Sequence, residues 1–139
     1  MNIVANKYQI TGYLGKGQFG SICKAVCIKT NKYFAVKLEH HDTKLSLLKH
    51  EATILFHLNS QKCKSIPFIY YYGCSSPYTI LVMTYYEGCL QTLSKNDFRV
   101  DDILEWWIES LSILENIHHS GIIHRDLKPA HFMKHCETK

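Results

Sequence analysis

The sequence predicts an α+β protein, in which an antiparallel sheet carrying one helix precedes a mainly helical region. Two kinds of apolar pattern support this prediction. Residues 8–38 and 66–83 contain short runs with the alternation or apolar content of strands, separated by turn residues. Residues 43–59 and 101–119 repeat apolar residues at steps of three or four, which is the period of a helix.

Composition narrows the class of protein. The 139 residues suffice for one domain with a core, and nine Tyr and six Phe favour a packed globule over a disordered chain. The net charge is +4 and the basic residues form no run, so we expect no nucleic acid partner. No stretch has the length of a signal-peptide core or a membrane span. We therefore expect no membrane partner and an intracellular, cytoplasmic location with reduced thiols.

Three strands are predicted first, at residues 8–14, 21–28 and 33–38, and the glycine-rich segment Gly15-Lys16-Gly17-Gln18-Phe19-Gly20 joins the first two. In the second strand Cys23 and Cys27 share a face, where packing explains them better than metal binding. A Gly-x-Gly-x-x-Gly run also occurs in dinucleotide-binding folds, and Glu39 lies near the distance of their acidic residue. However, strand, turn and strand follow these glycines, so no helix N-terminus is predicted to hold a pyrophosphate. A hairpin folded over phosphates fits better than this alternative or a plain tight turn.

A lysine and a glutamate accompany this hairpin. Lys37 ends an otherwise apolar strand, where burial of an ammonium without an anionic partner is costly. The helix predicted at 43–59 contains Glu51, which we expect to pair with Lys37 rather than to remain a solvated charge beside Lys49. The predicted apolar side of this helix consists of Leu45, Leu48, Ala52 and Leu55, extended by Phe56 and Asn59.

Two further strands, at 66–74 and 79–83, complete a predicted five-stranded antiparallel sheet. A short helix is predicted at 89–93 and a longer one at 101–119, with acidic residues in its first turn and Gly121 at its end. Core packing is the default expectation for Trp106 and Trp107. The apolar stripe of the long helix comprises Ile103, Trp107, Leu111, Leu114 and Ile117, widened by Leu104, Trp106, Ile108 and Ile113.

Charged residues follow the long helix. Ile122 and Ile123 form a strand-like pair, after which the chain reads His-Arg-Asp-Leu-Lys-Pro at 124–129. Pro129 prevents a helix from continuing through this loop. Asp126 lies two residues from Lys128, an arrangement suited to phosphoryl transfer. The carboxylate can orient a hydroxyl and accept its proton, while the ammonium neutralises charge on the phosphoryl group.

In order and spacing, these motifs closely resemble the eukaryotic protein kinases over about residues 8–132. Residues 123–132 are similar to the kinase catalytic loop, and the glycine run, Ala35-Val36-Lys37 and Glu51 occur at kinase spacing. The chain is most similar to the casein kinase I group. That likeness depends on Lys37-Leu38-Glu39, the strand ending at Met83, the Gly88-Cys89-Leu90 step, and His131-Phe132 in place of Asn-Phe.

The resemblance implies a small lobe at residues 8–83, a hinge at 84–88 and the start of a large lobe at 89–139. It implies Asp126 and Lys128 as catalytic residues acting on protein Ser or Thr, with ATP and magnesium or manganese as cofactors. Glu51 is implied as the ion-pair partner of Lys37. The implied nucleotide-binding residues are Leu14, Gly15, Lys16, Gly17, Gln18, Phe19, Gly20, Ser21, Ile22, Ala35, Lys37, Met83, Thr84 and Tyr86.

Two departures from the family pattern bear on activity. His131 replaces the magnesium-binding Asn and is the candidate metal ligand of this chain, although an imidazole nitrogen suits zinc, copper or nickel better than magnesium. The alternatives are that His131 holds manganese or, when protonated, contacts phosphate directly. No Asp-Phe-Gly motif occurs after Asp126. We therefore expect a truncated kinase domain with weak or absent phosphoryl transfer. The alternative is a non-catalytic module that binds nucleotide or a protein partner. Apolar surface left exposed on the large-lobe part would favour self-association.

Overall fold

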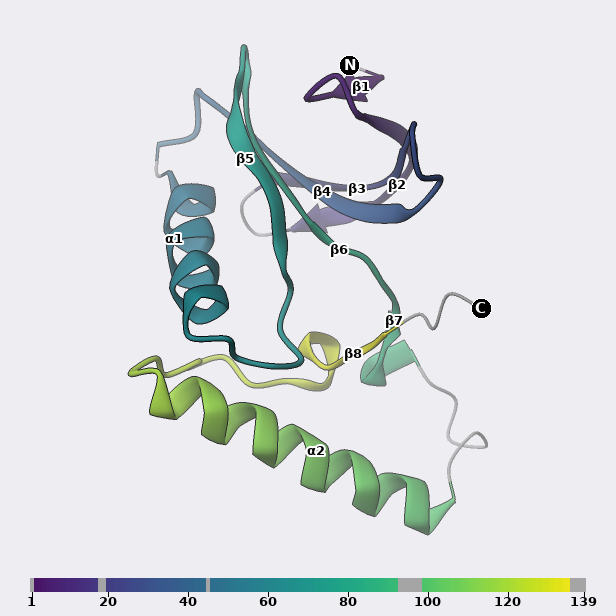
Figure 1. Ribbon diagram of the computed structural model, residues 1–139, viewed down its shortest axis with the longest axis vertical. Coiled ribbons are helices and arrows are strands. Elements are labelled where there is room, and N and C mark those ends of the chain that lie inside the picture. The colour runs from purple at the N-terminus through teal and green to yellow at the C-terminus, as the bar shows by residue number, and fades with distance from the viewer. Residues whose placement is uncertain (1, 18–19, 45, 93–98, 136–139) are drawn as a thin grey trace. The chain divides into compact units, whose positions relative to one another are not determined.

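The computed structural model of the chain describes residues 2–17, 20–44, 46–92 and 99–135 (Figure 1). The chain divides into two compact units. Unit 1 consists of residues 1–57 and 67–85, and unit 2 of residues 58–66 and 86–139. The Leu14-to-Ile22 hairpin, Lys37 and Glu51 belong to unit 1, whereas Asp126, Lys128 and His131 belong to unit 2.

Unit 1 is built on one antiparallel sheet with the strand order β1-β2-β3-β4-β6-β5. Consecutive strands pair as hairpins except where α1 intervenes, so that β6 rather than β5 lies beside β4. The strands are β1 (Ile3–Val4), β2 (Tyr8–Gly17), β3 (Gly20–Cys27), β4 (Tyr33–His40), β5 (Ile69–Ser75) and β6 (Tyr78–Thr84).

The predicted count of five strands is wrong, because the described part of this sheet has six. The additional strand is β1, which pairs Ile3 with Gln9 and Val4 with Tyr8. Two residues are too few to show an alternating pattern in the sequence. Val4 and Tyr8 are nevertheless both only 1% exposed, so β1 closes one end of the core.

Two apolar clusters occupy opposite faces of the sheet. Residues 34 and 36 of β4 belong to one cluster, whereas Ala35 belongs to the other, as the two-residue period of a strand requires. The first cluster consists of Val4, Tyr8, Cys23, Ala25, Cys27, Phe34, Val36, Ile80 and Val82. The second includes α1 and consists of Ala35, Leu48, Ala52, Leu55, Ile69, Leu81 and Met83. Cys23 and Cys27 are thus free thiols in a packed core.

Helix α1 (Leu47–Ser60) begins later than the residue 43 predicted from its periodicity. The backbone N–H and the hydroxyl of Thr43 both donate to the carbonyl oxygen of His40, at 3.1 and 2.7 Å, and so form a turn instead. Leu48, Ala52 and Leu55 face the sheet as predicted, whereas Phe56 is 49% exposed and forms a T-shaped pair with the Tyr72 ring. Leu45, also predicted on the apolar side, lies outside the described residues.

Unit 2 contains one long helix, α2 (Val100–His119), and a small two-stranded sheet of β7 (Tyr86–Cys89) and β8 (Met133–His135) that the sequence did not predict. Two 3-10 turns flank these strands: η1 (Leu90–Thr92), where a short helix was predicted, and η3 (Pro129–His131). The backbone N–H of Leu90 donates to the carbonyl oxygen of Phe132 at 2.9 Å and joins the two segments.

Local chemistry explains both ends of α2. The Asp102 carboxylate accepts a hydrogen bond from the backbone N–H of Arg99 at 3.1 Å, and Asp101 and Asp102 lie at the positive end of the helix dipole. Gly121 follows the last turn with φ +78° and donates its N–H to the carbonyl of His118, a left-handed conformation that favours glycine.

The core packing expected for the two tryptophans is wrong for Trp107, which is 64% exposed, while Trp106 is intermediate. In the same stripe Ile117 is buried at 8% exposure. The other exposed apolar residues of the helix are Ile103, Leu104, Ile108 and Leu111. Despite this apolar face, neither helix of the described chain combines the length and hydropathy needed to cross a bilayer.

Candidate functional site

The glycine-rich segment continues the sheet rather than ending it. Strand β2 runs to Gly17 and β3 starts at Gly20, with Gly17 opposite Gly20, Lys16 opposite Ser21 and Gly15 opposite Ile22. The register shifts between Tyr13 and Gly15, so the intervening Leu14 has no partner in the ladder and is 49% exposed. Gln18 and Phe19, predicted to bind nucleotide, lie outside the described residues.

Different structural constraints explain why glycine occupies positions 15 and 20. A Cβ at Gly20 would lie 2.0 Å from the carbonyl oxygen of Leu38, so β3 and β4 approach too closely there for any side chain. A Cβ at Gly15 would meet no atom within 4 Å, although its φ of +157° disfavours other residues. Gly20 is therefore explained by strand packing, whereas Gly15 is explained by its backbone conformation.

Lys37 and Glu51 form an ion pair between β4 and α1. Lys37 lies on β4 opposite Ile22 of β3, and β3 is one of the two strands of the glycine hairpin. Each side chain of the pair is 25% exposed, which keeps the charges partly desolvated. Lys37 donates to Oε1 of Glu51, and Oε2 is buried without a hydrogen-bond partner among the described residues. The pair fixes a cation on the face of the sheet that α1 covers.

Ala35 and Met83 lie directly opposite each other on β4 and β6, and both are buried in the cluster that includes α1. Thr84 ends β6, and both its backbone N–H and its side-chain hydroxyl form hydrogen bonds with Phe68. Its N–H donates to the carbonyl of Phe68 and its hydroxyl accepts from the N–H of Phe68, both at 3.0 Å. Tyr86 belongs to unit 2, where it pairs with His135.

An aromatic clamp at the end of unit 1 was not predicted. The Lys24 ammonium lies 4.0 Å from the Tyr33 ring centroid and 4.6 Å from that of Tyr85. Tyr85 is the last residue of unit 1 and follows the strand that ends at Thr84. Cation–π attraction thus fixes this residue to β3 and β4. The sequence offered no signal for Tyr85, because it lies far along the chain from both Lys24 and Tyr33.

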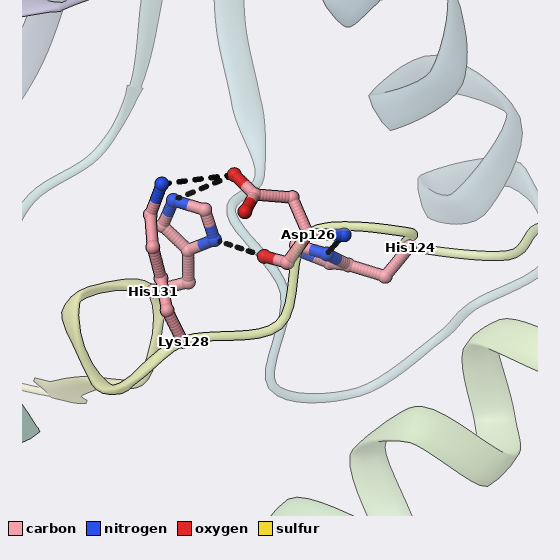
Figure 2. A network of polar contacts seen from close by, with 4 residues as sticks. All are labelled: His124, Asp126, Lys128 and His131. Atoms are coloured by element: carbon pink, nitrogen blue, oxygen red, sulfur yellow. Dashed lines mark hydrogen bonds and ion pairs between the residues drawn. The ribbon is translucent and has the colours of Figure 1, made fainter.

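In unit 2, Asp126 and Lys128 are brought together by a short local loop. The Lys128 ammonium donates to Oδ2 of Asp126 at 2.9 Å, and both side chains are at least half exposed (Figure 2). This hydrogen bond, together with the charge of Lys128, lowers the pKa of the Asp126 carboxyl below its ordinary value. Asp126 therefore stays a carboxylate, able to accept a hydrogen bond from a hydroxyl, even in mild acid.

His124 holds the loop from the other side. Its Nδ1 accepts the backbone N–H of Asp126 at 3.3 Å, while the intervening Arg125 has a φ of +63°. A non-glycine residue in this left-handed conformation is strained, and such strain is concentrated at functional sites. Partial burial, followed by the neighbouring His131, lowers the pKa of His124, which favours the neutral ring that can accept this bond. The strand predicted for Ile122 and Ile123 is absent from this loop, and Ile123 is 71% exposed.

His131 contacts Asp126 twice. Its Nδ1 lies 2.8 Å from the backbone oxygen of Asp126 and its Nε2 lies 3.8 Å from Oδ2 (Figure 2). Because a carbonyl oxygen only accepts, Nδ1 carries the proton and Nε2 faces the carboxylate. Pro129 at the first position of η3 sets up the turn that brings the ring back over the loop.

These donors do not fit magnesium. Magnesium prefers several oxygen ligands in octahedral geometry, whereas here an imidazole and an ammonium already surround the one carboxylate. In the described chain, no group of three or more His, Cys, Asp or Glu side chains is placed to hold a metal ion. In the described loop, His131 contacts Asp126 through both of its ring nitrogens.

The comparison with known families agrees with this inventory of motifs. The family model of the protein kinase domain matches residues 8–139, which is nearly the whole chain. The chain therefore belongs to the protein kinase domain family. The predicted site residues that the structure brings into contact form two groups, Lys37 with Glu51 in unit 1 and Asp126 with Lys128 and His131 in unit 2.

Proposed function

We propose that the chain is a serine/threonine protein kinase-like protein of the casein kinase I type that binds ATP through unit 1. The observation that carries this proposal is the Lys37–Glu51 ion pair, which lies one strand away from the glycine hairpin. Held by Glu51, the Lys37 ammonium is a fixed cation for nucleotide phosphates. The buried Ala35–Met83 pair supplies apolar surface beside this cation.

The Asp126 loop supports a role towards a substrate hydroxyl. A carboxylate with a lowered pKa is a weak base, so Asp126 would orient a Ser or Thr hydroxyl and take its proton late in transfer. Lys128 would offset negative charge on the transferred phosphoryl group. The proposed partner is therefore a protein substrate. A bound divalent cation would supply further charge neutralisation in kinase chemistry, and the donors described here do not provide its site.

The nucleotide proposal is tested by calorimetric titration of the full chain with ATP. We expect weak binding, in the millimolar range, that is lost in Lys37→Met. Lys32→Met is the matched control, because Lys32 is an exposed cation in the turn between β3 and β4. Loss of binding in Lys37→Met alone supports the proposal, whereas no detectable binding of millimolar ATP to the unmodified chain refutes it.

A second candidate is a non-catalytic kinase-like module, and the contacts of His131 favour it for this chain. His131 occupies the position of a metal-holding Asn, and its ring is engaged with Asp126 instead. We accordingly propose that phosphoryl transfer by this chain is very slow. Labelled ATP with casein, in magnesium and then in manganese, compares the unmodified chain with Asp126→Asn and His131→Asn. Robust labelling that Asp126→Asn abolishes would establish an active kinase and exclude the module.

A further inference from the structure

Glu39 is a buried carboxylate that the proposed nucleotide site does not use. It lies on β4, two residues after Lys37, and is only 3% exposed. Its Oε1 accepts the backbone N–H groups of Leu47 and Leu48 at 3.0 and 3.1 Å. These are the first two residues of α1, so a strand residue occupies the place of a helix cap.

The first turn of α1 depends on this external carboxylate. It contains no acidic residue, and Lys49 and His50 place basic groups at the positive end of the helix dipole. Glu39 supplies both the acceptor for two N–H groups and the negative charge that this end of the helix favours. Hydrogen bonds from amides to an ionised, buried carboxylate are among the stronger ones in proteins.

The geometry connects Glu39 to the Lys37–Glu51 pair. Lys37 and Glu39 lie on the same face of β4, about 7 Å apart along the strand. Glu51 follows Leu47 by four residues, which places it about 6 Å, slightly more than one turn, further along the same side of α1. Strand and helix are therefore joined by two polar contacts with matching spacing, Glu39 to the helix start and Lys37 to Glu51.

We propose that Glu39 is a positioning residue that sets the register of α1 on β4 and thereby holds Glu51 against Lys37. Apolar packing by Leu48, Ala52 and Leu55 attaches the helix to the sheet, but the hydrophobic effect is not directional. Two N–H groups that donate to one carboxylate oxygen are directional and therefore fix the position of the helix start. The inference concerns the ion pair and does not depend on nucleotide binding.

The test uses the full chain without nucleotide and follows two properties separately: the protection of the first backbone N–H groups of α1, and the integrity of the Lys37–Glu51 ion pair. Amide hydrogen exchange reports Leu47 and Leu48, with Val36 and Val82 of the sheet as internal references. The rate at which an acylating reagent modifies Lys37, read by mass spectrometry against Lys32, reports the pair. Glu51→Gln provides the value for a broken pair.

In Glu39→Ala, we expect exchange at Leu47 and Leu48 to increase about tenfold. The Lys37 modification rate should move to the Glu51→Gln value. Glu39→Gln keeps an acceptor oxygen and should change both readings less, which keeps the test valid if the alanine variant folds poorly. Unchanged Lys37 modification in both Glu39 variants overturns the proposal.

A rescue separates positioning from simple capping. Ser46 immediately precedes α1, so Ser46→Asp in the Glu39→Ala background supplies a cap from the helix's own chain. We expect this second change to restore slow exchange at Leu47 and Leu48 without restoring the Lys37 rate. Restoration of both readings would mean that Glu39 only caps α1, and would overturn its positioning role. Because neither reading requires ATP, failure of nucleotide binding would leave this result interpretable.

Discussion

The two units hold their functional charges by different means. In unit 1, Lys37 and Glu51 are 14 residues apart in sequence and meet because β4 and α1 enclose a shared apolar cluster. In unit 2, Asp126 and Lys128 are two residues apart and meet within one loop. The first pair is three-quarters buried, whereas the second is at least half exposed. The unit 1 contact is therefore a product of tertiary packing, and the unit 2 contact is a product of local geometry.

The same contrast appears in the distribution of apolar side chains. Unit 1 buries residues on both faces of its sheet, including Ile80, Leu81 and Val82 at 0% exposure. In the described part of unit 2, α2 leaves Trp107, Ile108 and Leu111 more than 60% exposed. Self-association through this face stays a prediction, which sedimentation velocity over a concentration series tests.

The largest expected effect on the free energy of unfolding comes from a Leu→Ala substitution made once in each unit. Leu81→Ala removes a fully buried side chain next to the Lys37–Glu51 pair and should lower the free energy of unfolding by about 3 kcal/mol. Leu111→Ala, at an exposed position of α2, should change it by less than about 0.5 kcal/mol. Urea unfolding followed by circular dichroism measures both, and equal losses would contradict the contrast.

A smaller effect compares the two lysines. Lys37→Met leaves the partly buried Glu51 carboxylate without its cation, and should cost about 1–2 kcal/mol of unfolding free energy. Lys128→Met removes an exposed local contact and should cost less than about 0.5 kcal/mol. The same urea measurement decides. A cost for Lys128→Met as large as that for Lys37→Met would show that the Asp126 loop is also held by packing.

The pH dependence of His124 is a third, still smaller effect. Its pKa lies below the ordinary 6.5 because burial and His131 disfavour the imidazolium. A depressed pKa means that its contribution to stability is complete above about pH 6.5 and is lost as the pH falls through the folded-state value. Nuclear magnetic resonance titration of the His124 ring should show this low pKa. His131→Asn should raise it, and a pKa at or above 6.5 in the unmodified chain would be inconsistent with the described loop.

The sequence predicted correctly those features that depend on short motifs with a fixed spacing. The glycine run, Lys37, Glu51 and the 124–129 motif each have a fixed spacing, so the kinase family and the Lys37–Glu51 ion pair could be inferred before the structure. The contacts of Asp126 with Lys128 and His131 were not predicted. The sequence was a poor guide where the outcome depends on residues distant in sequence. The two-residue strand β1, the carboxylate of Glu39 over the start of α1 and the Lys24 clamp all require the folded sheet. The predicted burial of Trp107 failed for a related reason, because an apolar stripe indicates a face to be covered but not what covers it.

The smallest expected effect is also the sharpest test of the contrast between units. Lys128 is the largest cause of the lowered pKa of Asp126, with smaller contributions from His131 and His124. Lys128→Met should therefore raise the Asp126 pKa towards its ordinary value, and His131→Asn should raise it less. A depressed carboxyl pKa stabilises the fold above the ordinary value of 3.8, and that contribution disappears as the pH falls through the folded-state pKa.

Because the contact between Asp126 and Lys128 is local, Leu81→Ala in unit 1 should leave the Asp126 pKa unchanged while it weakens the Lys37–Glu51 pair. Carboxyl carbon shifts measured between pH 2 and 6 follow Asp126 directly, and the Lys37 acylation rate follows the other pair. If Leu81→Ala moved the Asp126 titration as much as Lys128→Met does, the loop would be coupled to the core of unit 1 rather than formed by its own residues.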